Sequence, residues 1–192
     1  MEVNLKNALT QGSPLDIVIY PEAILAKKTA PITIFDDKLK KLAIDMLYTM
    51  YHAPGVGLAA PQVNRDMRMF VLDVEFDREK SADGMTYIFN NLNPMVFINP
   101  EITPMGNEKV KNQEGCLSLP GIYEDVNRFK TIKVKYQDLD GKTHELEASE
   151  LLGVCIQHET DHLNGIMFID HLSQLKHNFY RNKMIKQKKA FS

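Results

Sequence analysis

Two stretches of the chain place apolar residues at the three- and four-residue intervals of a helix with one buried face. The first opens after Asp36 and Asp37, which are suitable N-terminal caps. Its apolar positions are Leu39, Leu42, Ala43, Met46, Leu47, Met50 and Tyr51. The second helix is expected from Ser149, a candidate N-cap, to the stop signal Asn164-Gly165. The pattern predicts an early amphipathic helix and a later helix that is largely apolar over residues 151–156.

Short strand-like runs lie between these helices and before them. Residues 16–21, 67–76 and 95–102 are rich in the aliphatic and aromatic residues that strands favour. Residues 130–148 have the pattern of a hairpin, in which Asp140-Gly141 supplies the two positive-φ positions of a tight turn. The chain is therefore expected to combine helices with paired strands.

Two other segments are expected to be peripheral. The first 14 residues form a polar leader, which is expected to be loosely ordered. Residues 77–94 are rich in turn-forming residues and are expected to form a surface insertion. Neither segment belongs to an internal repeat or a low-complexity tract.

Length, composition and charge limit the class of protein. The 192 residues suit a single domain spanning residues 1–192, and 44% hydrophobic with 25% charged residues is typical of a soluble globular protein. A net charge of −2 favours no DNA partner, and no uncharged apolar run is long enough to cross a membrane. Two cysteines are too few for a disulfide framework, and the start lacks a signal-peptide pattern, so a cytoplasmic protein is expected.

The segment QHETDHLNG, residues 157–165, carries the first candidate chemistry. His158 and His162 are four residues apart, so both can bind one metal ion from the same face of a helix. Glu159 lies near the apolar face, where an unpaired carboxylate is costly unless it has a function. The motif supplies two ligands, and a third must come from elsewhere.

The identity of the third ligand separates several kinds of metal site. One protease pattern requires a third histidine at the position of Phe168, and another requires a downstream glutamate, although no glutamate follows Glu159. An upstream ligand is therefore favoured. The downstream residues that remain open as ligands are Asp170, His171 and His177.

Two upstream segments supply further candidates. EGCLSLPG, residues 114–121, places Cys116 at the expected end of a strand and offers a thiolate as the third ligand. GVGLAAPQ, residues 55–62, contains glycines that allow a ligand to approach the backbone closely, and Gln62 offers a side-chain amide donor.

These three segments resemble, in the same order, the motifs G-x-G-x-A-A-x-Q, E-G-C-x-S and Q-H-E-x-x-H-x-x-G of the peptide deformylase family. The resemblance extends from about Asp16 to Leu175. The leader, the insertion and the tail depart from the family pattern and leave the subclass open. The predicted fold is α+β, with mostly antiparallel β-sheets around a central helix that carries the H-E-x-x-H motif, plus an N-terminal amphipathic helix and a C-terminal helix.

The resemblance implies a metal-dependent hydrolase that removes the formyl group from the N-terminal formyl-methionine of newly synthesised polypeptides and releases formate. Its metal ligands would be Cys116, His158 and His162, with water in the fourth position. Fe2+ is the implied ion, one per chain, with Ni2+, Co2+ or Zn2+ as substitutes. Metal-activated hydroxide would attack the formyl carbon, with Glu159 as acid and base.

Further residues have implied roles in stabilising and binding the substrate. The side-chain amide of Gln62 and the backbone N–H of Leu117 would stabilise the tetrahedral intermediate. Gly57 and Gly115 would let the peptide backbone pair in extended form. Four residues are expected to line an apolar pocket for the methionine side chain, with core packing as the open alternative: Val56, Leu151, Val154 and Cys155.

Charged residues outside these motifs suggest two further features. Glu114 and Arg128 are candidates for an ion pair that steadies the Cys116 loop. The tail, residues 176–192, has six Lys or Arg and no acid between Lys176 and Lys189. A solvated helix face is the ordinary interpretation of such a run. The resemblance to bacterial deformylases adds the alternative of a contact with the ribosome.

Two other classes of function remain open at this point. A metalloprotease would cleave peptides without a formyl group, and a non-catalytic deformylase-like protein would only bind them. Glu159 and Gln62 argue against the second class, because a site without catalysis has little use for an acid-base group. The remaining histidines have no motif around them and are expected to be ordinary packing or surface residues: His52, His144, His171 and His177.

Overall fold

The computed structural model of the protein describes residues 4–53, 55–82 and 84–191. The first three residues of the expected leader, residue 83 of the expected insertion and residue 192 of the tail lie outside the described residues. The four α-helices of the described chain are α1 (Ala8–Gln11), α2 (Asp37–His52), α3 (Glu150–Leu163) and α4 (Gln174–Phe191). Short 3-10 helices occupy Leu5–Asn7, Ala23–Ala26, Ala60–Val63 and Phe168–His171.

Nine strands form three antiparallel sheets in the described part of the chain. The five-stranded sheet has the order β1 (Gly57–Ala59), β2 (Met69–Leu72), β5 (Met95–Pro104), β8 (Thr131–Gln137) and β9 (Thr143–Ser149). The two-stranded sheets are β3 (Asp77–Lys80) with β4 (Tyr87–Asn90), and β6 (Lys109–Cys116) with β7 (Leu119–Phe129). The predicted α+β fold with antiparallel sheets is therefore confirmed.

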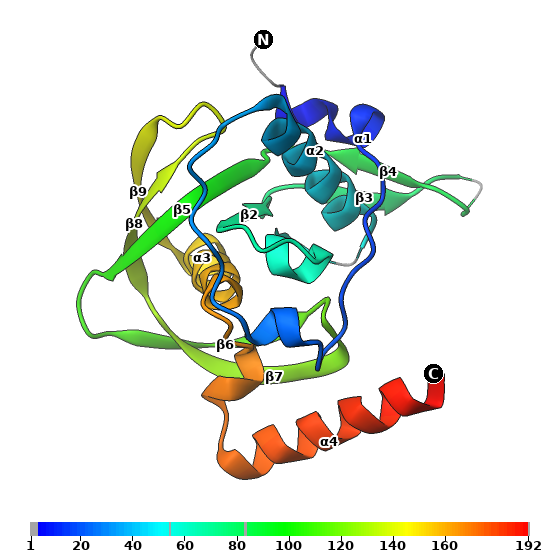
Figure 1. The fold of residues 1–192 in the computed structure, drawn as a ribbon, viewed down its shortest axis with the longest axis vertical. Coiled ribbons are helices and arrows are strands. Elements are labelled where there is room, and N and C mark those ends of the chain that lie inside the picture. The colour runs from blue at the N-terminus through cyan, green and yellow to red at the C-terminus, as the bar shows by residue number, and fades with distance from the viewer. Residues whose placement is uncertain (1–3, 54, 83, 192) are drawn as a thin grey trace.

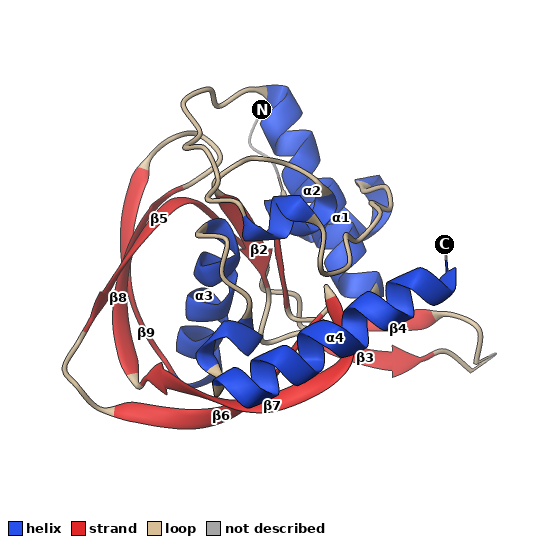
Figure 2. Ribbon diagram, turned by 60° about the horizontal axis from the view of Figure 1, so that its bottom comes forward, coloured by secondary structure: helices blue, strands red, loops and turns tan. Residues whose placement is uncertain are grey.

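Helix α3 lies in the middle of the molecule, between the five-stranded sheet and the β6–β7 ribbon (Figures 1 and 2). Its apolar side chains Ile156 and Leu163 are fully buried in a cluster with Phe70 and Phe97 of the sheet. At Gly153 an added Cβ would lie 3.0 Å from the carbonyl oxygen of Ala148, so there is little room for a side chain where α3 leaves β9. On the side of α3 that faces the ribbon, Gln157 bonds to the backbone of Phe129 and Asp161 to Arg128.

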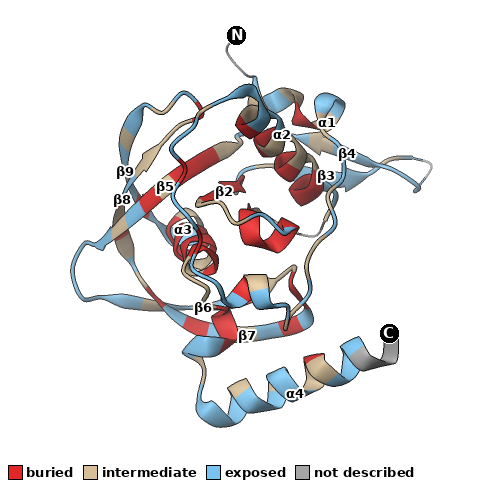
Figure 3. Cartoon of the chain, in the orientation of Figure 1, coloured by how far each residue is buried: buried red, intermediate tan, exposed pale blue. Residues whose placement is uncertain are grey.

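The early amphipathic helix is confirmed as α2. It begins at Asp37, and the side chain of Asp36 accepts a hydrogen bond from the backbone N–H of Leu39 at 2.9 Å. Its apolar stripe is almost fully buried, as the red segments in Figure 3 show. Because α2 packs on β1 and β2, it supports the side of the sheet from which the loop before Gly57 emerges.

Two expectations for the N-terminal region are wrong. Residues 5–11 of the leader are helical, and Ala8 is fully buried against α2 because Leu5, Ala8 and Leu9 fall on one side of the turns. Residues 16–21 do not form a strand in the described chain. They run extended with isolated bonds from Val18 N–H to the Gln62 carbonyl (2.8 Å) and from Tyr20 N–H to the Ser118 carbonyl (2.9 Å).

The hairpin expected at residues 130–148 is confirmed as β8–β9, but its turn is not the expected one. The strands pair up to Gln137 and Thr143, which leaves residues 138–142 as the connection. Only Gly141 has a positive φ (79°) in this connection. The Asp138 carboxylate accepts the N–H groups of Asp140 and Lys142, both at 2.9 Å, and this capping stabilises the longer turn.

Two elements lie at the periphery. The expected insertion is exposed, and it forms the β3–β4 hairpin that projects from the body in Figure 1. Helix α4 lies outside the sheets and is mostly exposed (Figure 3), except that Met184 is buried against the β7 side. None of the described helices combines the length and the apolar character needed to span a membrane.

Candidate metal centre

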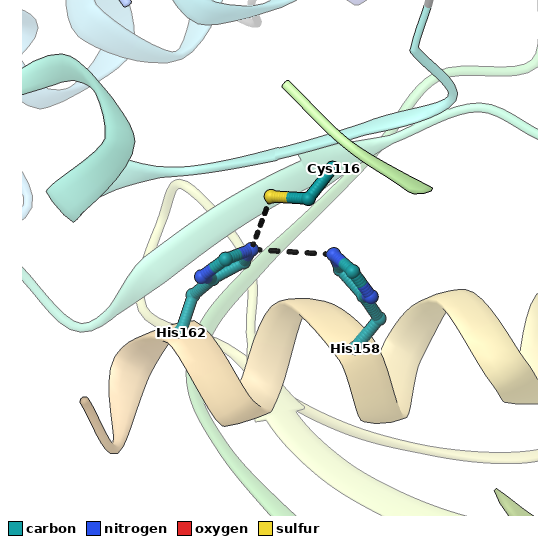
Figure 4. Close-up of side chains that lie close together, drawn as sticks. All are labelled: Cys116, His158 and His162. Atoms are coloured by element: carbon teal, nitrogen blue, oxygen red, sulfur yellow. Dashed lines mark hydrogen bonds between the residues drawn. The ribbon is translucent and has the colours of Figure 1, made fainter. Parts of the chain in front are cut away.

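The two histidines of the H-E-x-x-H motif meet the predicted cysteine at one point (Figure 4). His158 and His162 lie one helical turn apart on α3, and their Nε2 atoms are 3.2 Å from each other. The Sγ atom of Cys116, at the end of β6, lies 3.3 Å from Nε2 of His162. The three ligand atoms all lie within 4.8 Å of one another. The predicted thiolate and imidazoles thus converge as one metal site requires.

The His158 ring is oriented by Glu114, as is usual for metal-binding histidines. Nδ1 of His158 is 2.8 Å from Oε2 of Glu114, which leaves Nε2 facing the cysteine. Burial opposes ionisation of Glu114, but hydrogen bonds from Arg128 and His158 outweigh it and lower its pKa to about 2. Burial and the neighbouring His158 lower the pKa of His162, so its ring is neutral, the form that coordinates metal.

A buried network of ion pairs holds Glu114, and through it the His158 ring, in place. Arg128 donates to both oxygens of Glu114, at 2.7 and 2.9 Å, which confirms the expected pair. Its Nη1 also donates to Asp161 on α3 at 2.5 Å, and Asp161 lies 2.7 Å from Nε2 of His171. Arg128 therefore joins the strand that carries Cys116 to the helix that carries both histidines.

Glu159 is a buried carboxylate with one oxygen left free. Burial raises its pKa to about 7, so it can both accept and donate a proton near neutral pH. Its Oε2 has no hydrogen-bond partner within the part of the chain that the structure describes. Its Oε1 lies against the backbone of β1, since an added Cβ at Gly57 would be 2.3 Å away. The carboxylate is placed beside the metal ligands and can still bond to a bound molecule.

The amide of Gln62 points toward the same place. Its Oε1 accepts a hydrogen bond from the N–H of Ala59 (2.8 Å), and this fixes its Nε2 as the outward donor. Nε2 lies 3.4 Å from Sγ of Cys116 and 3.2 Å from Oγ of Ser118. Leu117 lies between the ends of β6 and β7 at the same site. Both predicted donor residues therefore border the metal ligands.

A cleft of about 500 Å³ opens onto these groups. The six predicted substrate-binding residues all line it: Val56, Gly57, Gly115, Leu151, Val154 and Cys155. Val154 and Cys155 are buried in its wall, whereas Val56 and Leu151 lie at its mouth, 36% and 53% exposed. The cleft is large enough for an unbranched apolar side chain and the adjoining backbone.

Sequence reasoning missed three contributors to the site. Asp161 and His171 belong to the Arg128 network, although His171 was expected to be an ordinary residue. Ser118 is fully buried next to Gln62. Asp161 could have been noticed, because it is a carboxylate beside His162, whereas nothing near His171 in the sequence indicates its contact. The other histidines make their contacts elsewhere, with Tyr48, Asp138 and Asp170.

One thiolate, two imidazoles and a free buried carboxylate at the bottom of a cleft define a candidate single-metal enzyme site of the H-E-x-x-H class. Comparisons with known proteins agree with this class. The sequence profile of the polypeptide deformylase family matches residues 14–178. Peptide deformylase 1 of Pseudomonas syringae is 46% identical over 175 residues, which cover 91% of this chain and 96% of that protein. The peptide deformylase of Zymomonas mobilis is also 46% identical, covering 91% and 95%.

Solved structures show the same similarity in the fold. The crystal structure of a peptide deformylase from Legionella pneumophila is 38% identical and has a TM-score of 0.79, covering 93% of this chain and 97% of that one. A peptide deformylase from Synechococcus elongatus, in complex with actinonin, is 37% identical with a TM-score of 0.75, covering 88% and 85%. The chain belongs to the polypeptide deformylase family and is an enzyme.

The two cysteines are expected to differ sharply in reactivity. Burial, assisted by the charge of Glu159, raises the pKa of Cys155 to about 12, so its thiol stays protonated at pH 8. Iodoacetamide at pH 8 should therefore label Cys116 and spare Cys155 in folded, metal-free protein, as measured by mass spectrometry of the peptides. Labelling of both thiols before unfolding would contradict this assignment.

The Arg128 network is expected to contribute strongly to stability. The side chain of Arg128 is 5% exposed, so Arg128→Met leaves Glu114 and Asp161 buried without their cation. We expect a loss of about 3–5 kcal/mol in the free energy of unfolding, measured by urea denaturation. Lys133→Met is the matched control, because its pair with Glu145 is half exposed and should contribute less than about 1 kcal/mol. If both variants lost the same free energy of unfolding, the buried network would contribute no more to stability than an exposed ion pair.

Proposed function

We propose that this enzyme is a metal-dependent hydrolase that removes the formyl group from the N-terminal formyl-methionine of new polypeptides and releases formate. The observation that carries the proposal is the convergence of Cys116, His158 and His162 beside the free carboxylate of Glu159. Membership of the deformylase family supports the reaction. Because such substrates are made at bacterial ribosomes, we place the enzyme in the cytoplasm, as a single catalytic domain.

The donor set fits one divalent ion. A thiolate and two imidazoles are borderline-soft ligands, which suit Fe2+ and also accept Ni2+, Co2+ or Zn2+, and we propose Fe2+ as the resident ion. When bound, the ion would lower the pKa of a water molecule and polarise the formyl carbonyl. The bond from His158 to Glu114 supports the fit, because it holds the ring with Nε2 toward Cys116.

The protein residues around the formyl group have separate roles. Glu159 takes the proton of the attacking water and delivers it to the leaving nitrogen, a role that suits its pKa of about 7. The amide of Gln62 and the backbone N–H of Leu117 donate to the oxygen that becomes negatively charged. Support for Gln62 comes from its Oε1, whose bond to Ala59 N–H turns the donor end toward the site.

The cleft binds the methionine and the backbone that follows it. The methionine side chain lies against the apolar wall made by Val154 and Cys155, with Val56 and Leu151 at the mouth. The peptide backbone pairs with the strand ends at Gly57 and Gly115, two positions where the cleft wall has no side chain. Such pairing recognises the peptide backbone independently of the side chains, which suits an enzyme that acts on many new proteins.

Contact between the tail and the ribosome stays a proposal. Two of the basic side chains of the tail bind acids of the same chain: Lys176 binds Glu124 at 2.7 Å, and Lys188 binds Glu22. The outward face of α4 still carries Leu175 and Phe179, 81% and 63% exposed. We propose that this exposed helix face contacts ribosomal RNA or a ribosomal protein.

Formate release tests the proposed function. The purified enzyme, loaded anaerobically with Fe2+, is expected to release formate from formyl-Met-Ala-Ser and to leave unformylated Met-Ala-Ser and casein uncleaved. Glu159→Ala should lower the rate by about 100- to 10,000-fold. It should leave the metal content, measured by plasma emission spectrometry, at the wild-type level. Casein cleavage without formate release would replace this function with that of a metalloprotease.

Gln62 is expected to act on turnover more than on affinity. Gln62→Leu removes a donor that the substrate meets fully only as its oxygen becomes charged, so kcat should fall by about 100- to 1000-fold with little change in KM. Gln113→Leu is the control, because Gln113 lines the same cleft from the exposed face of β6 and has no proposed role. A large rise in KM with normal kcat would assign Gln62 to substrate binding instead.

A further inference from the structure

Asp73 is a fully buried carboxylate that has no part in the proposed chemistry. It follows the last residue of β2, and its exposed fraction is 0%. The cost of burying such a group is offset only when its oxygens are well supplied with donors. Asp73 meets this condition, and the identity of its donors shows what it holds together.

The Asp73 carboxylate binds two parts of the structure. Oδ2 accepts the hydroxyl of Tyr51, in the last turn of α2, at 2.7 Å and the N–H of Asn93 at 2.8 Å. Oδ1 accepts the N–H groups of Glu75 and Phe76 at 3.0 and 3.2 Å. One side chain thus fastens both ends of the β3–β4 hairpin to helix α2.

The donors match a carboxylate and no other short side chain. Burial and the bond to Asp73 raise the pKa of Tyr51, so its hydroxyl stays protonated and donates. The other donors are backbone N–H groups, which cannot accept. An asparagine would turn its amide hydrogens toward one pair of donors, and each pair contains a backbone N–H that cannot accept, so Asp73→Asn must lose at least one of the four bonds.

The same residue holds one wall of the cleft. The backbone N–H of Asp73 donates to the carbonyl of Val56 at 2.9 Å, and Arg78 on the hairpin donates to the carbonyl of Ala53 at 3.1 Å. Ala53, Val56 and Gly57 all line the cleft. Gly57 in turn lies against Glu159, where no β carbon fits. A shift of this wall would therefore change the position of the bound substrate and that of the Glu159 carboxylate at the same time.

We propose that Asp73 is a positioning residue for the deformylation reaction: it anchors the Val56–Gly57 wall to α2 and to the β3–β4 hairpin, and so fixes the wall against Glu159. This inference rests on the proposed function for its kinetic consequence, but the anchoring itself does not. It also gives the hairpin a role, since Arg78 and the hairpin ends support the wall from outside.

The kinetic test compares a strong variant, a mild variant and a control. Asp73→Asn is expected to raise KM for formyl-Met-Ala-Ser by about tenfold and to lower kcat by less, because the wall that pairs with the substrate loses its anchor. Tyr51→Phe removes one of the four bonds and should raise KM by about twofold to threefold. Metal content should stay at the wild-type level in both.

The control separates positioning from a loss of stability alone. Asn99→Ala removes an amide that binds both backbone groups of Ile32 and the side chain of Gln137, far along the sheet from the cleft wall. It should lower the melting temperature while KM stays unchanged. If Asp73→Asn and Tyr51→Phe also change only the melting temperature, Asp73 has no positioning role.

Hydrogen–deuterium exchange tests the anchoring without any enzyme assay. Peptides covering residues 55–59 should exchange faster in Tyr51→Phe and Asp73→Asn than in the wild type, whereas peptides of β8–β9 should not change. Unchanged exchange at residues 55–59 overturns the proposal even if formate release is confirmed. Faster exchange supports the anchoring even if the wild-type enzyme releases no formate, and that result would reject the proposed function alone. Should Asp73→Asn fail to fold, Tyr51→Phe still decides between these outcomes.

Discussion

The whole site depends on one buried cation shared by two carboxylates. Arg128, on β7, binds Glu114 of β6 and Asp161 of α3. Glu114 stands two residues before Cys116, and Asp161 stands next to His162, so the position of the thiolate relative to the imidazoles is set through this guanidinium. A planar group with several fixed donors can hold two anions at defined angles, which a lysine ammonium cannot do. The ribbon and the central helix are therefore joined where the chemistry requires it.

The sequence was enough to predict the parts of the site and the Glu114–Arg128 pair, but not the rest of the network that supports them. The four-residue spacing of His158 and His162 requires only a helix, and the apolar period of α2 is equally local. The support depends on contacts between distant residues: Arg128 meets Asp161 33 residues away. Such pairs leave no periodic trace in one sequence. The convergence of Cys116 with the histidines was expected only through the family resemblance.

The mistaken expectations also have physical causes. Residues 16–21 have the composition of a strand, but no neighbouring strand offers them a ladder, so they make isolated bonds to Gln62 and Ser118. The turn after β8 contains Asp140-Gly141, yet Asp138 captures two backbone N–H groups and closes a longer loop. In each case a tertiary or side-chain contact outweighed a local preference.

The charge of the residues that line the cleft bears on which substrates the proposed reaction would accept. Apart from cysteine and tyrosine, the ionisable residues among its described lining are Glu114, His158 and Glu159. All three lie at the candidate metal centre, away from the mouth. The rim is made of residues such as Ile19, Val56 and Leu151, which carry no charge. Under the proposed function, the uncharged side chains at the mouth offer a substrate no direct ion pair that would favour one sign of charge. For the proposed deformylation, the lining of the mouth therefore gives no reason to exclude either an acidic or a basic protein.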